Sequence, residues 1–494
     1  MNRKIVVTWL CLIMQFCFVV IVIDISTPVK AETIWIDDSF STEDATHKKT
    51  IQAGIDNATF KDTVYVYNGT YYENIVVNKS ISLIGEDIYS TEIVGGDNGD
   101  VVYVNSDWVN ITGFTIRGSG FRKAGIELNN VQFCKIAGNN LKNNSYDIYL
   151  ESSCYNYIMN NNISFYNREG ISLRYSNGNN ITSNIITSSR DAGIFTYNSN
   201  ENIVIDNIVS SVINSGIHIY NSSKNYIYGN RVNNSYRGIT IQYTGENTII
   251  GNIASYNREG INLHGAENNN ISYNIIYDNE DGIILNDYWP SKNNSIFSND
   301  ITDNVKGIFL SASSESSTIN NNNISYNDYG VYLSHCSNHN QIYDNIISNN
   351  EFSIYTTWIL TEDLFSNNVF KNNSNHYQID SDGDGVVDNL DFDPNDPTVH
   401  TDSDGDGHPD NRDAFPFNSD EWKDTDRDGI GDNSDSDNNG NIIPDDFEIP
   451  LAIFITLIPF IMLFLLFKRM KKRKDLKGEL SLSQNEEINT KKEI

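Results

Sequence analysis

The sequence predicts an all-β protein whose largest part is a parallel β-helix solenoid. A short phrase of glycine followed by alternating apolar residues recurs along the middle of the chain, as in EGINL (259–263) and DGIIL (281–285). Its glycines lie 22 or 23 residues apart, with one step of 25, at positions 170, 193, 216, 238, 260, 282, 307 and 330. A fixed period of this size is typical of solenoids, in which each repeat forms one coil.

Each repeat has a second half of the form Asn-x-Ile-x-x-Asn-x-Ile-x-x-Asn, which is clear in NTIIGNIASYN (247–257). Every period therefore contains three short apolar segments rich in β-branched residues, and such segments favour strands. A leucine-rich repeat has the same period, but leucine is sparse in this chain. Three strands per period describe one coil of a β-helix. Residues 64–375 would supply roughly 13 coils, a rod of about 60 Å at ~4.8 Å per coil.

The corner residues fit this interpretation. Glycine before the first strand of each coil is expected to adopt a positive φ, and asparagine is the next residue to tolerate that region. Asparagines at the same corner of successive coils are expected to stack and exchange amide hydrogen bonds. In the first strand Ile261 should point inward and Asn262 outward, so aspartate at 261 would destabilise the rod and aspartate at 262 would cost little.

A cap is expected at each end of the solenoid. TIQAGIDNA (50–58) predicts a short amphipathic helix over the first opening, followed by the strand-like DTVYVYNGTYYENIVV (62–77), and residues 358–379 would close the other end. Residues 32–379 would thus form one capped domain.

Residues 50–375 resemble the NosD-like, right-handed parallel β-helix repeats of secreted carbohydrate-associated proteins, above all in IQAGIDNATFKDTVYVYNGTYYENIVVNKSISLIGE (51–86). The resemblance implies a right-handed coil and a periplasmic or surface location. For the namesake of the family it also implies a role in copper insertion into nitrous oxide reductase. The eight histidines of this chain are scattered, whereas copper prefers clustered His, Met and Cys ligands.

The N-terminus carries a secretory signal. Arg3 and Lys4 precede an apolar run, and Val29-Lys30-Ala31 places small or apolar residues at a cleavage site. Residues 1–31 are therefore predicted to be a signal peptide, with an uncleaved anchor as the alternative.

A membrane span is predicted near the C-terminus. Residues 449–467 form a stretch of 19 residues without a charge, which as a helix would cover about 28 Å. The following tail, residues 468–494, begins with a basic cluster, and the positive-inside rule places it in the cytoplasm. The protein would then be single-pass, with its N-terminal part outside the cell; a buried core helix is the alternative.

The segment between solenoid and span, residues 380–448, has 23 acidic and 3 basic residues. Three stretches, DSDGDGVVDNLD (380–391), DSDGDGHPDNRD (402–413) and DTDRDGIGDNSD (424–435), place oxygen-bearing side chains at loop positions 1, 3, 5, 9 and 12, with glycine at 6. Calcium is bound by six to eight oxygens in such loops. A fourth stretch, DNNGNIIPDDFE (437–448), has isoleucine at position 6.

The predicted calcium ligands of the four loops are Asp380, Asp382, Asp384, Asp388 and Asp391; Asp402, Asp404, Asp406, Asp410 and Asp413; Asp424, Asp426, Asp428, Asp432 and Asp435; and Asp437, Asn439, Asn441, Asp445 and Glu448. The loops begin 22 residues apart and lack flanking helices, and they resemble thrombospondin type 3-like repeats, most closely in 413–435. Calcium would convert an expanded acidic chain into a stiff stalk. The alternative is a solvated acidic linker.

In the first strand of each coil, the residues that alternate with the inward Ile and Leu should point outward. Flat aromatic faces stack on sugar rings, and amides hydrogen-bond hydroxyl groups. This face is therefore a candidate glycan surface, although the ordinary strand preference of Tyr and Phe explains it equally well. Its aromatic and histidine members are Tyr149, Phe195, Tyr197, His218, Tyr220, His264, Phe309 and Tyr332.

Catalytic candidates are few. A glycosidase needs two carboxylates about 5–10 Å apart. Glu259 and Asp281 precede the glycine on adjacent coils, and Asp191 and His218 are expected near one another. The Arg-Glu pair in the recurring phrase YNREGI (166–171 and 256–261) indicates ion pairs between coils. No motif of pectate lyases, polygalacturonases or alginate epimerases is found.

The sequence thus predicts a membrane-anchored surface protein with a calcium-binding stalk, serving adhesion, glycan binding or envelope structure. The alternatives are a polysaccharide lyase, hydrolase or epimerase acting on the first-strand face, and a NosD-like copper accessory protein. The net charge of −31 argues against nucleic acid as a partner. Outside the signal, Cys134, Cys154 and Cys336 are an odd number, so buried thiols are expected more than a Cys134–Cys154 bridge. Thirteen Asn-x-Ser/Thr sequons are compatible with glycosylation.

Overall fold

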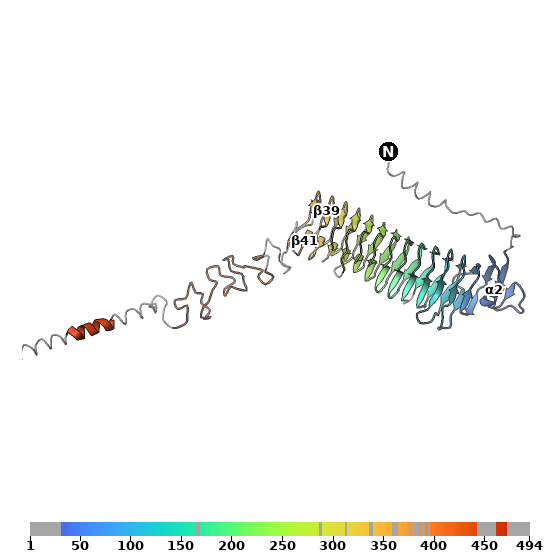
Figure 1. The fold of residues 1–494 in the computed structure, drawn as a ribbon, viewed down its shortest axis with the longest axis horizontal. Helices are drawn as coiled ribbons and strands as arrows, with labels where there is room; N and C mark the ends of the chain where they lie inside the picture. Colours follow the sequence, from blue (N-terminus) through green and yellow to red (C-terminus); the bar gives the residue numbers. More distant parts are fainter. Residues whose placement is uncertain are drawn as a thin grey trace, which may run out of the picture. The chain divides into compact units, whose positions relative to one another are not determined.

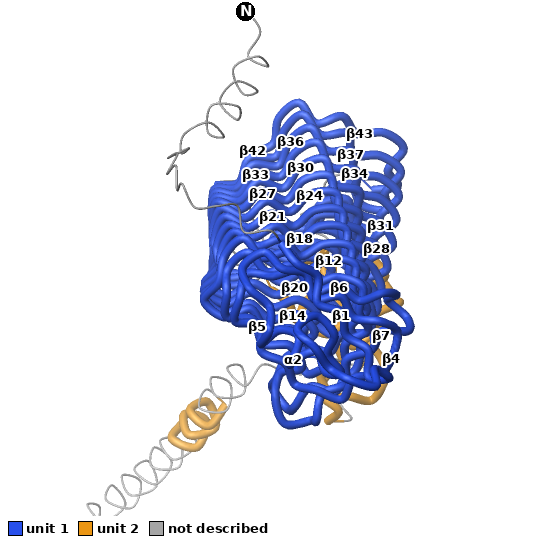
Figure 2. The backbone as a smooth tube through the Cα atoms, turned by 90° about the vertical axis from the view of Figure 1, so that its right-hand side faces the viewer, with its two compact units in different colours: residues 1–385 blue, residues 386–494 orange. Residues whose placement is uncertain are grey.

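The computed structural model describes residues 31–164, 168–285, 289–311, 314–334, 339–357, 364–375, 378–379, 386, 391–393, 396–441 and 461–471. The chain divides into two compact units, residues 1–385 and residues 386–494 (Figure 2). In the first unit, coils follow one another in sequence order along a rod, with α2 (Ile51–Asn57) at its N-terminal end (Figure 1). The predicted right-handed parallel solenoid of about 13 turns is confirmed.

Three parallel sheets form the sides of the rod. Among the described residues, sheet A contains 16 strands, in the order β2 (His47–Lys48), β1 (Thr33–Ile36), β3 (Thr63–Val66), β6 (Ser82–Gly85), β9 (Asn110–Thr112), β12 (Lys135–Ala137), β15 (Tyr157–Met159), β18 (Asn180–Thr182), β21 (Ile203–Ile205), β24 (Tyr226–Tyr228), β27 (Thr248–Ile250), β30 (Asn270–Ser272), β33 (Ser295–Phe297), β36 (Thr318–Asn320), β39 (Gln341–Tyr343) and β42 (Leu364–Ser366).

Sheets B and C each contain 14 strands in the described part of the chain. Sheet B consists of β4 (Gly69–Tyr72), β7 (Thr91–Val94), β10 (Thr115–Arg117), β13 (Asn140–Lys142), β16 (Asn162–Ser164), β19 (Ile185–Thr187), β22 (Ile208–Ser210), β25 (Arg231–Asn233), β28 (Ile253–Ser255), β31 (Ile275–Tyr277), β34 (Asp300–Thr302), β37 (Asn323–Ser325), β40 (Ile346–Ser348) and β43 (Val369–Lys371). Sheet C consists of β5 (Ile75–Val77), β8 (Val102–Val104), β11 (Ala124–Asn129), β14 (Tyr146–Glu151), β17 (Glu169–Arg174), β20 (Ala192–Tyr197), β23 (Ser215–Tyr220), β26 (Arg237–Gln242), β29 (Glu259–His264), β32 (Asp281–Leu285), β35 (Lys306–Leu310), β38 (Tyr329–Leu333), β41 (Phe352–Thr356) and β44 (Gln378–Ile379).

The core is a set of aliphatic columns inside the three sheets. Strands pair in register, so that Ile239, Ile261 and Ile283 lie opposite one another on successive coils of sheet C. All three are fully buried. Fully burying such a side chain contributes about 1.5–3 kcal/mol to folding, which explains why one isoleucine per short strand is enough.

The repeated glycines of sheet C do not have the expected conformation. None of the glycines at 170, 193, 216, 238, 260, 282, 307 and 330 has a positive φ. Their role is steric: a Cβ on Gly193 would lie 2.4 Å from Val209 Cγ1 and 2.6 Å from the carbonyl oxygen of Gly216 in the next coil. The predicted positive φ is therefore wrong, and glycine is needed because adjacent coils approach closely there.

Buried asparagine ladders occupy all three corners, as the sequence predicted. At the corner between sheets A and B, the Asn184 side-chain amide donates to Asn207 Oδ1 (3.0 Å) and to the carbonyl oxygen of Ile158 (2.9 Å), while its backbone N–H also donates to Asn207 Oδ1. The residue before each ladder asparagine, such as Asp206 with φ of 54°, adopts the left-handed conformation, and the ladder residue itself does not.

The ladder at the corner between sheets A and B consists of Asn139, Asn161, Asn184, Asn207, Asn230, Asn252, Asn274, Asn299, Asn322, Asn345 and Asn368. Between sheets C and A it consists of Asn156, Asn179, Asn202, Asn225, Asn247, Asn269 and Asn294, and between sheets B and C of Asn257, Asn279, Asn304, Asn327, Asn350 and Asn373. Because an amide offers both a donor and an acceptor, each asparagine satisfies its neighbour in the next coil.

The N-terminal cap is present. Thr50 caps α2 by accepting a hydrogen bond from the Ala53 N–H, and the Glu73 carboxylate accepts from the N–H groups of Ile51 and Gln52. Ile51 and Ile55 are fully buried, so the helix covers the core at this end. The expected second cap, residues 358–379, is described in part. Residues 364–375 and 378–379 are described, whereas 358–363 and 376–377 lie outside the described residues.

Cys134 and Cys154 are free, and Cys134 is buried, as expected for a thiol that fills core space. Cys336 and the signal segment 1–30 lie outside the described residues. In the predicted span, residues 461–467 are described and belong to a helix that continues to 471, whereas 449–460 are not described. Within the described ranges, no helix combines the length and the apolar character needed to cross a membrane.

Candidate functional site

The outer surface of sheet C, called here the sheet C face, carries the predicted aromatic residues. All eight of them are half-buried rather than fully exposed. The rings of Tyr197 and Tyr220 stack at 5.6 Å between centroids, and Tyr220 contacts Tyr243 edge-on at 5.6 Å. A second group begins at Phe309, which contacts Tyr332 at 5.1 Å; Tyr332 stacks on Tyr355 at 5.1 Å. The face therefore presents two aromatic groups along the rod.

On the two coils between these groups, Asn262 and Ile284 take the corresponding positions, and both are buried. Asn262 is 1% exposed and donates to the Glu259 carboxylate at 2.5 Å, and Ile284 is 6% exposed. The expectation that Asn262 points freely into solvent is wrong, because its side chain is buried and hydrogen-bonded to Glu259. An aspartate at 262 would lie against Glu259 and would be destabilising.

The structure does not bring Asp191 and His218 together. Asp191 forms an ion pair with Arg168 of the preceding coil (3.1 Å), while His218 contacts the Gln242 side chain at 2.9 Å. Burial, with a smaller effect of Arg237, lowers the pKa of His218 to about 4. His218 is thus a neutral ring at neutral pH.

Glu259 and Asp281 do lie opposite one another on β29 and β32. Each is buried and has a basic partner from a neighbouring coil: Arg237 for Glu259 at 2.8 Å and Lys306 for Asp281 at 3.3 Å. Arg258 likewise pairs with Glu280 at 3.0 Å. These contacts are the ion pairs between coils that the repeated Arg-Glu phrase indicated.

A polar cluster at the N-terminal end of the sheet C face was not singled out from the sequence. Glu127 lies opposite Tyr149 in register, and the Tyr149 hydroxyl donates to Glu151 Oε2 at 2.5 Å. The Arg174 guanidinium lies 5.8 Å from the centre of the Tyr149 ring. Burial raises the pKa of Glu127 and, together with Glu151, that of Tyr149. The available signal was the alternation of Glu, Tyr and Arg at outward positions of three consecutive coils.

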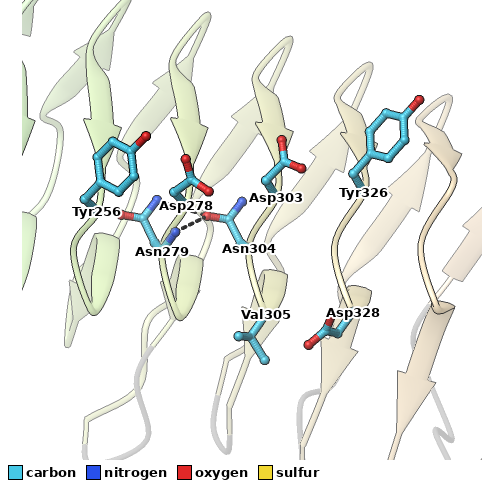
Figure 3. Close-up of a pocket in the computed structure, with 8 residues that line it drawn as sticks. All are labelled: Tyr256, Asp278, Asn279, Asp303, Asn304, Val305, Tyr326 and Asp328. Carbon is cyan, nitrogen blue, oxygen red and sulfur yellow. Dashed lines mark hydrogen bonds between the residues drawn. The ribbon is translucent and has the colours of Figure 1, made fainter.

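A shallow groove of about 510 Å³ follows the corner between sheets B and C (Figure 3). Tyr256, Asp278, Asp303 and Tyr326 follow the sheet B strand of four successive coils and share one line, with the ladder residues Asn279 and Asn304 beneath (Figure 3). In the described part of the chain, neither aspartate forms an ion pair. No separate signal in the sequence pointed to this groove, because its residues lie at corner positions.

Two of the acidic loops gather their carboxylates. One oxygen from each of Asp402, Asp404 and Asp406 lies within 4.8 Å of the others, and the same holds for Asp424, Asp426 and Asp428. Oxygens of Asp404 and Asp413 are buried without a hydrogen-bond partner. Such sets of acceptors could hold a divalent cation.

In the two loops that are described, the aspartate at position 9 also accepts hydrogen bonds from its own loop. Asp410 accepts hydrogen bonds from the Ser403 N–H (2.8 Å) and the Thr401 hydroxyl (2.9 Å), and Asp432 accepts from the Thr425 N–H (2.7 Å). These two aspartates close the loops. Of the other predicted ligands, Asp380, Asp382, Asp384, Asp388, Asp445 and Glu448 lie outside the described residues.

The comparisons with known structures agree with the fold. The chain is similar to the A-module of the mannuronan C-5 epimerase AlgE6 of Azotobacter vinelandii (16% identity, 65% of this chain, 94% of that chain, TM-score 0.49). It is also similar to the pre-mature gene product 12 of bacteriophage phi29 (12% identity, 65% of this chain, 53% of that chain, TM-score 0.56) and to the periplasmic alginate epimerase AlgG (15%, 63%, 77%, 0.41). At these identities the likeness concerns the fold alone. Curated proteins provide no match to this chain.

A family model described as "Periplasmic copper-binding protein (NosD)" matches residues 55–237 and 211–359. The residues described here do not fit copper, because the side-chain groups among them that could share a metal ion are all aspartates, and copper prefers His, Cys and Met. His218 and His264 contact Gln242 and Tyr243 instead. The match covers most of the solenoid and more than half of the chain, and the protein belongs to the NosD family.

Proposed function

We propose that this protein binds polysaccharide outside the cytoplasm, along the sheet C face. The observation that carries the proposal is the line of ring contacts on this face over successive coils, from Tyr197 through Tyr220 to Tyr243. Aromatic rings supply large apolar area with a polar edge, and a parallel β-helix repeats them at about 4.8 Å. A linear polymer can follow such a surface, whereas a small ligand would need a closed pocket.

The test is a glycan array followed by calorimetry on the purified full-length protein. The double variant Tyr197→Ala/Tyr220→Ala should weaken binding of the best glycan. The matched control is Tyr226→Ala/Tyr228→Ala, because these two tyrosines also stack on each other, at 5.9 Å, but lie on sheet A. Equal binding by both double variants and the wild type would show that the sheet C face is not the binding surface.

A polysaccharide lyase or epimerase is the second candidate, and the polar cluster around Tyr149 favours it. A uronic acid has an acidic proton beside its carboxylate. Glu127, whose raised pKa suits a base, could accept that proton, Tyr149 could donate one, and Arg174 could pair with the carboxylate. Unsaturated products released from uronate polymers, and lost with Tyr149→Phe at unchanged binding, would establish this activity.

We also propose that one C-terminal helix anchors the protein and that residues 380–448 bind calcium as a stalk. The 19 uncharged residues followed by a basic cluster support the anchor. The gathered aspartates of two loops support calcium. Protease added to intact cells should remove residues 32–448 and spare an epitope on residues 480–494; loss of that epitope would reverse the proposed orientation.

A further inference from the structure

One column of side chains on the rod surface contains a gap. The residue two positions before each sheet A strand lies at the same corner of successive coils, because β3, β6, β9, β12 and β15 pair in register. This corner column consists of Lys61, Ser80, Trp108, Phe133 and Tyr155. It lies between sheets C and A and is separate from the sheet C face.

The three aromatic members of the corner column stack face to face. Trp108 and Phe133 have ring centroids 4.5 Å apart and planes 22° apart, and Phe133 and Tyr155 are 5.9 Å and 14° apart. All three adopt a positive φ of 58° to 61°, which is uncommon for bulky residues. Trp108 nevertheless remains 63% exposed, because only one of its two ring faces is covered.

The uncovered face of Trp108 borders a pocket at Ser80. The pocket has a volume of about 480 Å³ and is lined by Phe60, Lys61, Ser80, Ile81, Ser82 and Trp108. Ser80 stands one coil before Trp108 in the strand register and contributes a small side chain to the pocket wall. Coils are ~4.8 Å apart, so Lys61 and Trp108 are separated along the rod by about 10 Å, which leaves room for one ring at stacking distance from both sides.

The pocket combines a flat apolar wall with polar groups. Lys61 Nζ lies 5.1 Å from the centre of the Phe60 ring, and in the described part of the chain Lys61 forms no ion pair with a carboxylate. Ser80 and Ser82 also line the pocket, and the Ser80 hydroxyl shares a hydrogen bond with the Ser106 hydroxyl at 3.3 Å. A ligand ring that offers a stacking face, hydroxyl groups and a negative charge would match all of these features.

We propose that the gap at Ser80 binds one pyranose ring of an acidic polysaccharide, stacked on Trp108 with its carboxylate near Lys61. The choice of a sugar rests on the proposed function, whereas the position of the site does not. A polymer held here would contact a surface other than the sheet C face.

The first test compares Trp108→Ala with Tyr155→Ala in the full-length protein by calorimetry, with hexa-galacturonate as the acidic probe and cellohexaose as the neutral one. Both variants remove one exposed ring from the same stack, but only Trp108 borders the pocket. Trp108→Ala should weaken hexa-galacturonate binding roughly two- to tenfold, the value of one aromatic contact. Tyr155→Ala should leave it unchanged.

The second test fills the gap. Ser80→Tyr puts a bulky ring into the pocket wall, so it should abolish binding at this site, and circular dichroism would check that the variant is folded. Lys61→Gln should weaken hexa-galacturonate but not cellohexaose, and the difference should shrink at high salt. If a flat aromatic compound such as indole-3-acetate binds at this site and neither saccharide does, the sugar assignment is wrong.

The two surfaces can be separated with the sheet C variants. Loss of hexa-galacturonate binding in Tyr197→Ala/Tyr220→Ala with wild-type affinity in Trp108→Ala and Ser80→Tyr would overturn this inference and leave the proposed function intact. The reverse pattern would support the gap and overturn the sheet C face. No saccharide binding by the wild type would overturn both.

Discussion

The corners of the solenoid and the acidic loops at 402–435 both repeat one polar residue type at a period of about 22, but the residues differ in what they contact. In a corner ladder, Asn230 accepts from Asn207 and donates to Asn252 and to the carbonyl oxygen of Val204. In the loops, oxygens of Asp404 and Asp413 are buried with no donor. The ladders and the loops thus have a similar spacing. In the ladder the donors and the acceptor of the Asn230 side chain are all paired, whereas in the loops some carboxylate oxygens lack a donor.

The difference follows from the functional groups. An amide is both donor and acceptor, so a column of identical amides can be satisfied from within, whereas a carboxylate only accepts. A column of aspartates therefore has acceptors and negative charges but no side-chain donors of its own, so its carboxylates must be neutralised by other groups. We therefore expect the rod to be stable by itself, and we propose that the acidic loops depend on a cation. The following predictions test this contrast.

The largest effect is expected from a charge placed in the core of the rod. Ile276 is fully buried on β31, whereas the adjacent Ile275 is 45% exposed. Ile276→Asp should reduce the free energy of unfolding by more than about 5 kcal/mol, because the carboxylate would be buried without a partner. Ile275→Asp is the matched control and should cost less than about 1 kcal/mol. Urea denaturation followed by circular dichroism would measure both, and similar losses would contradict the strand register.

The next effect concerns a single ladder residue. Asn322 is buried, donates to the carbonyl oxygen of Ile296 and accepts from both the N–H and the side-chain amide of Asn299. Asn322→Ala should cost about 4 kcal/mol, because two buried donors of Asn299 lose their acceptor. Asn323→Ala, at the exposed first residue of the following strand β37, should cost under about 1 kcal/mol. If the two variants were equally stable, the ladders would not contribute to the rod.

A smaller effect should appear as a pH dependence. The pKa of His218 is about 4 in the folded protein and about 6.5 in the unfolded chain, so below pH 6.5 only the unfolded state gains the proton. Stability should therefore fall as the pH drops from 6.5 to 4, by about 3 kcal/mol from this residue. His218→Gln should show that much less loss over the same range. Parallel curves for wild type and variant would contradict a neutral ring.

The smallest effect concerns calcium. Extracellular modules bind calcium with dissociation constants of about 0.1–1 mM, so 1 mM calcium should stabilise an acidic loop by roughly 0.4–1.4 kcal/mol. Asp404→Asn/Asp426→Asn should weaken binding in calorimetry, and magnesium should substitute poorly. The control is Asp278→Asn/Asp303→Asn, which removes two exposed aspartates of the rod. If the heat and the stoichiometry of calcium binding were unchanged by the first pair of substitutions, the ions would lie elsewhere.

The sequence predicted the solenoid and its ladders because both depend on periodicity alone. The prediction for the sheet C glycines was wrong, because periodicity shows where a glycine recurs but not why it is needed. A glycine can be required by a positive φ or by close neighbours that leave no room for a Cβ. For Gly193 the close neighbours are Val209 and Gly216. The prediction for Asn262 was also wrong. Strand alternation predicts to which side of the sheet a side chain points, but not whether that side chain is exposed to solvent.

Site geometry was harder to predict for a similar reason. The loop pattern gave Asp402, Asp404 and Asp406 together, and the structure brings them together, but it could not show that Asp410 closes the loop. The corner column was missed because Lys61, Ser80 and Trp108 are 19 and 28 residues apart, outside the regular period, in coils that precede the regular repeat.

The corner ladders also bear on the length of the protein. Each coil presents to the next the same donors and acceptors that it receives from the one before, as Asn207, Asn230 and Asn252 do in turn. Removing or duplicating one complete coil would therefore rejoin equivalent partners and leave no hydrogen bond unmade, while changing the rod by about 4.8 Å. Genetic gain or loss of whole repeats can thus adjust how far the rod reaches, in fixed steps and with little selection against intermediate lengths.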